Sequence, residues 1–241
     1  TKESQREISV QAANNAIESA RGISYPNALN LPIDESKIPH FVKPYIELTQ
    51  KMAFLLAQLS KSEIRSINIT AEGEISEYLD SLQTFATVGV LAVSCGDEVN
   101  YVNANFIAKE KGIDLTTSEF SNHSGYQNKV SINITTPTGV KTISGTVFNE
   151  DVQRIVEING FPLDIEPKGK MIIMRNHDVP GVIGEVGKIL GNNNINIADF
   201  RLSRGKDGAL AVILIDEKAS SDVLKKLDSL EAAIAVAYAE I

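Results

Sequence analysis

Three polar side chains near the C-terminal end of the chain are spaced so that they can hold the charged groups of an amino acid. Asn176 and Asp178 stand just before a helix that starts near Gly181, and Asn196 begins a strand that follows it. The free backbone N–H groups of Gly181 and Val182, with the helix dipole, favour a carboxylate. A carboxylate or amide side chain nearby can accept hydrogen bonds from an ammonium group. The pattern indicates an amino-acid site; in the structural alternative, Asp178 only caps the helix and Asn196 only follows a turn.

Glycines recur along the same helix at positions 181, 184, 187 and 191, which raises the question of a dinucleotide site. The Rossmann fingerprint places glycines at the first, third and sixth positions of a tight turn. Here the spacing does not fit, and Pro180 suits the first turn of a helix instead. The spacing favours close packing at Gly184 and Gly187 over binding of NAD.

Composition excludes several other classes of site. The net charge of −8 has the wrong sign for a protein that neutralises nucleic-acid phosphates. The single cysteine, Cys95, excludes a disulfide framework and a multi-cysteine metal site, and the 3 histidines have no metal-ligand spacing. No apolar run reaches the ~18 residues that a membrane span needs, and the polar residues 1–7 lack the apolar stretch of a signal peptide. We expect a cytoplasmic protein without metal, membrane or nucleic-acid partners.

The elements that position these residues fall into an α/β (α+β) arrangement of two domains behind an N-terminal segment. A capping box at 4–7 opens a helix, a proline-containing connector spans 24–39, and an apolar stripe from Tyr45 to Leu59 marks a second helix. Residues 62–167 form an α/β domain with a large antiparallel component. Its predicted elements are a strand at 64–73, a helix at 78–93, a short helix ending near Gly112, and strands at 128–136, 140–148, 152–158 and 161–166.

Residues 168–241 carry a complete pattern of their own after a boundary at Pro167–Lys170. Strand patterns at 171–175, 195–203, 209–216 and 234–238 alternate with helical patterns at 182–190 and 223–230. The order is β-α-β-β-α-β, which predicts a ferredoxin-like fold.

Three groups of motifs, in chain order, make the sequence similar to the D-3-phosphoglycerate dehydrogenase family. One resembles the end of the family's catalytic half, one its intervening allosteric-substrate-binding (ASB) domain, and one its ACT domain, a regulatory amino-acid-binding module. The motifs are Thr1–Gln5 with Asn27–Pro32, Glu98–Ala104 with Ala108–Ile113, and Asn176–Gly184 with Asn194–Ile197.

The resemblance implies a domain plan: 1–61 is the end of the substrate domain with connecting helices, 62–167 the ASB domain and 168–241 the ACT domain. It also implies a parent enzyme that oxidises 3-phosphoglycerate with NAD at the start of L-serine synthesis. In the family, the cofactor loop and the catalytic arginine, glutamate and histidine lie in the catalytic half, and none of these motifs stands in the 241 residues. We therefore assign no catalytic residue and expect NAD to bind only the parent enzyme.

The resemblance further implies binding sites and partners. L-serine is the implied effector, at positions matching Asn176, Asp178 and Asn196, and the catalytic half of the enzyme is an implied partner. The ASB domain of the family binds an anion, for which Lys109, Lys129 and Lys141 are the basic candidates, with solvated surface lysines as the alternative.

Other assemblies and functions remain open at this point. Homo-oligomers through the ACT domain, the ASB domain or both are expected, and alternating alanines at 233–239 allow close packing of the last strand. Alternative functions are a free-standing amino-acid-binding regulator and the regulatory portion of an iron–sulfur L-serine dehydratase, whose cluster Cys95 alone cannot hold.

Overall fold

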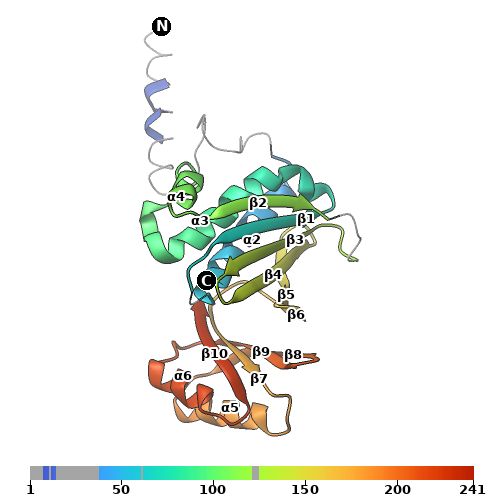
Figure 1. Cartoon of the computed structure of the whole chain (residues 1–241), viewed down its shortest axis with the longest axis vertical. Helices are drawn as coiled ribbons and strands as arrows, with labels where there is room; N and C mark the ends of the chain where they lie inside the picture. The colour runs from blue at the N-terminus through green and yellow to red at the C-terminus, as the bar shows by residue number, and fades with distance from the viewer. Residues whose placement is uncertain (1–7, 11, 15–37, 61, 121–124) are drawn as a thin grey trace.

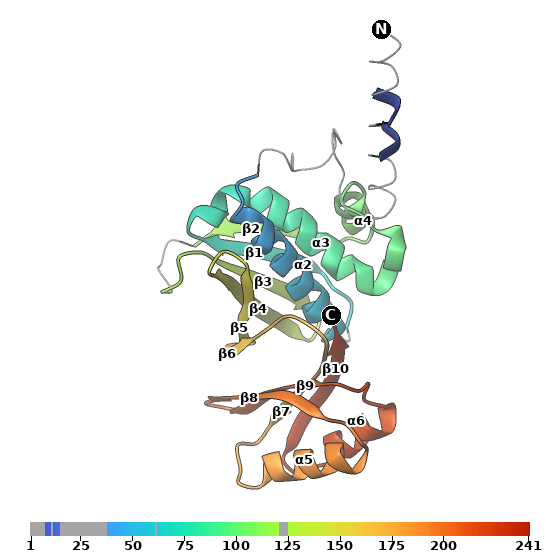
Figure 2. The same ribbon diagram turned by 180° about the vertical axis from the view of Figure 1, so that it is seen from behind.

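The computed structural model describes residues 8–10, 12–14, 38–60, 62–120 and 125–241, which form two sheets with helices packed on one face of each (Figures 1 and 2). Residues 8–10 and 12–14 are helical, as expected for the first helix. The predicted capping box at 4–7, nearly all of the predicted connector at 24–39, and the motifs at 1–5 and 27–32 lie outside the described residues.

The first sheet contains six strands in the order β2-β1-β3-β4-β5-β6. Only the β1–β2 pair is parallel, and every other neighbouring pair is antiparallel, as the sequence predicts for most of this domain. The bounds are β1 Ser66–Glu72, β2 Asp114–Glu119, β3 Lys129–Thr136, β4 Gly139–Phe148, β5 Val152–Ile158 and β6 Phe161–Ile165.

Two long helices cover one face of this sheet. α2 (Val42–Gln58) packs on β3, β4 and β5, and α3 (Leu79–Cys95) packs on α2, β1 and β2. The predicted stripe from Tyr45 to Leu59 is buried against the sheet. The short helix α4 (Ala104–Glu110) packs on α3, and the 3-10 segments η1 (Glu74–Tyr78) and η2 (Gly96–Glu98) flank α3.

The helical stretch Glu74–Glu98 is, by length and composition, apolar enough to cross a membrane, with a mean hydropathy of 1.2. However, α3 within it packs on α2, β1 and β2, and 50% of the apolar 18-residue window is buried. Packing in the core of this domain accounts for its apolar residues, so the stretch is only weak evidence for a membrane span.

Strand β2 was not predicted from the sequence. Its residues read Asp-Leu-Thr-Thr-Ser-Glu, and all but Leu115 are exposed. An edge strand with one neighbour and little burial needs no apolar alternation, so the main sequence signal for a strand is missing here.

The second sheet has four strands in the order β10-β7-β9-β8, with α5 (Val182–Asn192) and α6 (Ser221–Asp228) on one face. The strands are β7 Lys170–Asn176, β8 Ile197–Gly205, β9 Gly208–Ile215 and β10 Ala233–Glu240. The chain order is therefore β-α-β-β-α-β, and the predicted ferredoxin-like fold is confirmed.

The other face of the second sheet, which has no helices, packs on the first domain. Five buried residues of this face belong to the same apolar cluster as α2 and the first sheet: Met171, Ile173, Leu210, Val212 and Ala239. The alanine side chains at 237 and 239 face this junction, opposite Ile173 and Met171 in register. Their small size therefore serves packing between domains, an explanation that the sequence analysis did not consider.

Hydrogen bonds and a ring contact add to this junction. The side-chain amide of Gln58, at the end of α2, donates to the carbonyl oxygen of Glu240 at 3.0 Å and accepts from its N–H at 3.1 Å. The ring of Phe161 on β6 lies 5.2 Å from the guanidinium of Arg175 on β7 and also contacts Gly205 at the end of β8. The two sheets are thus joined by both apolar and polar contacts.

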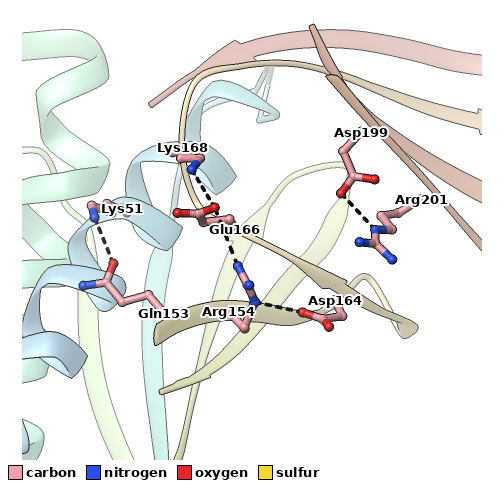
Figure 3. Close-up of polar contacts among 8 residues, drawn as sticks. All are labelled: Lys51, Gln153, Arg154, Asp164, Glu166, Lys168, Asp199 and Arg201. Atoms are coloured by element: carbon pink, nitrogen blue, oxygen red, sulfur yellow. Dashed lines mark hydrogen bonds and ion pairs between the residues drawn. The ribbon is translucent and has the colours of Figure 1, made fainter. Parts of the chain in front are cut away.

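A small network of ion pairs lies where β5 and β6 lead into the connector (Figure 3). Arg154 contacts the carboxylates of Asp164 at 3.2 Å and Glu166 at 3.8 Å, and Glu166 also pairs with Lys168 at 2.7 Å. All four side chains reach solvent, so each pair adds little to stability.

Candidate functional site

A cavity of about 440 Å³ lies beside the start of α5, between that helix and the β8 side of the second sheet. Four of the five residues predicted for the amino-acid site line it: Asn176, Asp178, Gly181 and Val182. The full lining is Met174, Asn176, Asp178, Val179, Pro180, Gly181, Val182, Ile183, Gly184, Val186, Phe200, Leu202, Arg204 and Ala211.

Asn176 is the last residue of β7 and the most deeply buried polar group of the cavity. Its side chain is on the same face of the strand as the buried Met174, which fixes its direction toward the helices. Asn176 is 2% exposed, and its Nδ2 has no hydrogen-bond partner among the residues that the structure describes. A buried amide without a partner is costly, so this group is suited to bind a ligand that enters the cavity.

Asp178 does not cap α5, contrary to the structural alternative in the sequence analysis. The residue at the N-cap position is Gly181, with φ of 97°, and no side chain bonds to the free amides there. The carboxylate of Asp178 instead pairs with Nε of Arg204 at 3.2 Å. Pro180 precedes the N-cap rather than occupying the first helical turn, because the left-handed Gly181 is the N-cap and the helix begins at Val182.

The prediction of close packing at Gly184 and Gly187 was wrong. A Cβ atom built at either position, or at Gly191, would meet nothing within 4 Å. Gly184 lines the cavity, so the absence of a side chain there keeps the cavity open instead of allowing another element to approach.

Arg204 is the lining residue that sequence reasoning missed. It lies in β8, which pairs antiparallel with β9, and its neighbour in register is Ala209, which in turn lies opposite Asn176. The Gly205–Gly208 turn predicted between these strands was a usable signal, because it fixes Arg204 at the same end of the sheet as the start of α5.

Asn196 lies at the opposite end of the sheet, so the expectation that it is close to Asn176 and Asp178 was wrong for a single chain. Both β7 and β8 are antiparallel to β9 and are therefore parallel to each other. Asn196 precedes β8, and at about 3.3 Å per residue it is roughly 25 Å from Arg204. There its Nδ2 donates to Asp216 at 2.6 Å and its N–H donates to Glu217 at 2.7 Å.

The three lysines proposed for an anion site are not brought together. Lys109 is on α4, Lys129 begins β3 and Lys141 is in β4 opposite Ile134. The register separates Lys129 from Lys141 by five residues along β3, about 16 Å. Lys141 also donates a hydrogen bond to the carbonyl oxygen of Leu59. The anion site expected from these lysines is not formed.

The described part of the chain contains no group of three or more His, Cys, Asp or Glu side chains that could hold a metal ion. The chemistry that the cavity offers is therefore that of its own groups: one carboxylate, one guanidinium, one buried amide and the free N–H groups at the start of α5. These complement the carboxylate and ammonium groups of an α-amino acid.

Comparisons with known proteins divide the chain in the same way. Residues 41–159 match the D-3-phosphoglycerate dehydrogenase intervening domain, and residues 170–232 match the ACT domain. The chain is 33% identical over 239 residues to the D-3-phosphoglycerate dehydrogenase of Bacillus subtilis (strain 168), covering 98% of this chain and 46% of that protein. It is 29% identical over 246 residues to the D-3-phosphoglycerate dehydrogenase of Archaeoglobus fulgidus, covering 100% of this chain and 46% of that protein. It is 27% identical over 231 residues to that of Synechocystis, covering 94% of this chain and 42% of that protein. The chain thus spans a little under half the length of these relatives.

Proposed function

The chain belongs to the D-3-phosphoglycerate dehydrogenase family, of which it carries the intervening and ACT domains, and we propose that it is the regulatory portion of such an enzyme. The parent enzyme would oxidise 3-phosphoglycerate to 3-phosphooxypyruvate with NAD, as the resemblance to the family implies. The sequence has no dinucleotide fingerprint, so NAD binding and catalysis are assigned to the part of the relatives that this chain does not match.

The proposed regulatory ligand is an α-amino acid bound in the cavity at the start of α5, and L-serine is the effector that the family resemblance implies. The observation that carries this proposal is the buried amide of Asn176, which has no protein partner among the described residues and lines a cavity with a carboxylate and a guanidinium at its edge. The ammonium group of the ligand would bind Asp178. Its carboxylate would bind Arg204 and the free amides of Val182 and Ile183.

Self-association through the ACT domain would complete this site. Strand β8 is at the edge of its sheet and pairs only with β9, so its outer edge is available for another strand. If two copies pair their β8 strands antiparallel about a two-fold axis, Asn196 of one copy comes to the Arg204 end of the other. This arrangement would restore the predicted role of Asn196, as a contact supplied by the second copy.

Calorimetric titration of the whole chain with L-amino acids, beginning with L-serine, tests the effector site. We expect Asp178→Asn to weaken binding by roughly ten- to a hundredfold, the cost of a lost charge-assisted hydrogen bond. Asp164→Asn is the matched control, since this carboxylate also pairs with an arginine, Arg154, at 3.2 Å but lies on β6 and does not line the cavity. Equal affinities for wild type and Asp178→Asn would exclude the proposed contact.

Two further measurements test the rest of the proposal. The chain alone should not oxidise 3-phosphoglycerate in the presence of NAD, and turnover by the purified chain would contradict its assignment as a regulatory portion. The contribution of Asn196 from a second copy predicts that Asn196→Ala weakens binding and that wild-type affinity rises with protein concentration. A concentration-independent affinity that Asn196→Ala leaves unchanged would exclude that contribution.

A further inference from the structure

Strand β8 lies at the edge of the second sheet, and alternate residues of this strand direct their backbone groups outward. The turn at 206–207 joins β8 to β9, so Gly205 and Gly208 form the hydrogen-bonded pair that closes the hairpin. Hydrogen-bonded and non-hydrogen-bonded pairs alternate along an antiparallel ladder. Arg201 therefore bonds to β9, whereas Phe200 directs its N–H and carbonyl groups away from the sheet.

The outward N–H of Phe200 is bonded by a side chain of its own strand. It donates to Oδ1 of Asp199 at 2.8 Å, and Oδ2 of Asp199 accepts from Nε of Arg201 at 2.9 Å (Figure 3). The side chains of Asp199 and Arg201 are 37% and 52% exposed. The middle of this edge therefore carries a negative and a positive group, two residues apart on one face of the strand.

Pairing of β8 with β8 of a second copy about a two-fold axis matches these charges in one register. With Phe200 at the axis, Asp199 of each copy lies directly opposite Arg201 of the other. The neighbouring registers that keep the same faces together place Asp199 or Arg201 at the axis. Two aspartates or two arginines would then lie opposite each other and repel. Charge complementarity therefore favours the register centred on Phe200.

The same register satisfies the other groups at this edge. The N–H of each Phe200 would donate to the carbonyl oxygen of the other, because this residue directs both groups outward. Oδ1 of Asp199 would then be free to accept from Arg201 of the second copy. The ring of Phe200 is partly buried on the helix-covered face, and the two rings would pack against each other at the axis.

We infer that β8 is the contact between two copies of this chain, in the register centred on Phe200, and that the charges of Asp199 and Arg201 select this register. The inference rests on the proposed function, in which the ACT domain associates through β8, and it adds the register and the residues that set it. Because Phe200 also lines the cavity at the start of α5, the two cavities of the dimer adjoin across the axis.

Sedimentation velocity of charge variants, alone and mixed, tests the pairing. Asp199→Arg places arginine at all four positions and Arg201→Asp places aspartate at all four. Each variant alone should therefore associate roughly tenfold or more weakly than wild type. An equimolar mixture of the two should restore association, because every opposite pair again joins an arginine to an aspartate. Asp228→Arg, on the exposed surface of α6, is the control and should associate as wild type does.

Cysteine cross-linking measures the register directly. Opposite Cα atoms of a hydrogen-bonded antiparallel pair are about 5.5 Å apart, which is within disulfide range. In a Cys95→Ala background, Phe200→Cys should form a disulfide-linked dimer on oxidation. Leu202→Cys is the matched control, since the two copies of this residue would be displaced along the strands by four residues, roughly 13 Å. Circular dichroism of each variant establishes that it is folded.

Each outcome bears on the inference. Weak association of the single charge variants, its recovery in their mixture, and cross-linking at position 200 but not at 202 support it. Single variants that associate as tightly as wild type, or a mixture that does not recover, overturn it. Cross-linking at 202 instead of 200 also overturns it, and leaves self-association through β8 standing. A wild-type chain that stays monomeric overturns both the inference and that self-association, whereas the effector site is tested separately by the titration of Asp178→Asn.

Discussion

Replacement of Asn176 by leucine should stabilise the ligand-free protein and remove ligand binding at the same time. The two side chains branch at the same carbon and have similar shapes, so leucine fits the space without overpacking. Asn176 is 2% exposed and its Nδ2 has no partner among the described residues, so the folded protein bears the full cost of removing this amide from water. Leucine has no such cost and can pack against the buried apolar residues of the second domain, such as Met174.

The magnitude follows from the desolvation of one polar group. A buried donor without a partner costs about 1–3 kcal/mol, so Asn176→Leu should raise the free energy of unfolding by that amount. For a chain of this length each kcal/mol corresponds to about 2–4 °C in Tm. Amino-acid binding should fall by roughly ten- to a hundredfold, because the free Nδ2 of Asn176 would also donate to the carboxylate of the ligand, and this charge-assisted hydrogen bond is lost in the variant.

Urea denaturation followed by circular dichroism measures the change in stability, and calorimetry measures the change in affinity. Asn128→Leu is the matched control: Asn128 is also buried, but its Oδ1 accepts a hydrogen bond from the N–H of Ile75 at 3.0 Å. Its replacement leaves that N–H unpaired and should destabilise the protein by about 1–3 kcal/mol. If both variants are destabilised, the amide of Asn176 is satisfied in the folded protein and the reasoning for a ligand at this position is refuted.

Substitutions at other positions test the packing of the protein and the pH dependence of its stability. Gly89→Ala should destabilise the protein by about 1–3 kcal/mol in urea denaturation, because its Cβ would overlap the backbone of α2, whereas Gly187→Ala should stabilise it by about 0.5–1 kcal/mol. Phe161→Ala should lower the free energy of unfolding by about 3–5 kcal/mol, because the ring packs between the two sheets. The loosened junction should also speed limited proteolysis at residues 166–169. Unchanged cleavage would argue against that junction. Desolvation, with help from a neighbouring carboxylate, raises the pKa of Tyr238 to about 12. This contribution to stability is complete below pH 10 and is lost as the pH rises toward 12, so unfolding measured at pH 8 and 11 should show a smaller loss in Tyr238→Phe than in wild type.

The order of elements in the second domain could be read from the sequence because its signals are local. Apolar residues recur with period two in the strands and at helical spacing in α5 and α6, and glycine-containing turns separate them. The same kind of signal identified α2 and β3–β6. It failed for β2, an exposed edge strand whose sequence has almost no apolar residue to bury.

The candidate site was predictable only in its local part. Asn176, Asp178 and Gly181 are within six residues of one another, so any turn between β7 and α5 keeps them together. Arg204 and Asn196 both lie in or next to β8, and composition alone does not distinguish them. The direction of β8 does: it brings its C-terminal end to the cavity and takes its N-terminal end about 25 Å away.

The sequence by itself therefore determined the regular segments other than β2, which face of each is buried, and that a polar loop precedes a helix with free amides. The tertiary structure alone decided that Arg204 pairs with Asp178, that the three lysines stay apart, and that Ala237 and Ala239 of β10 face the other domain. The physical reason is that periodicity reports burial along one segment. Which ends of which segments meet depends on strand direction and register, and these are set by contacts between residues that are distant in the sequence.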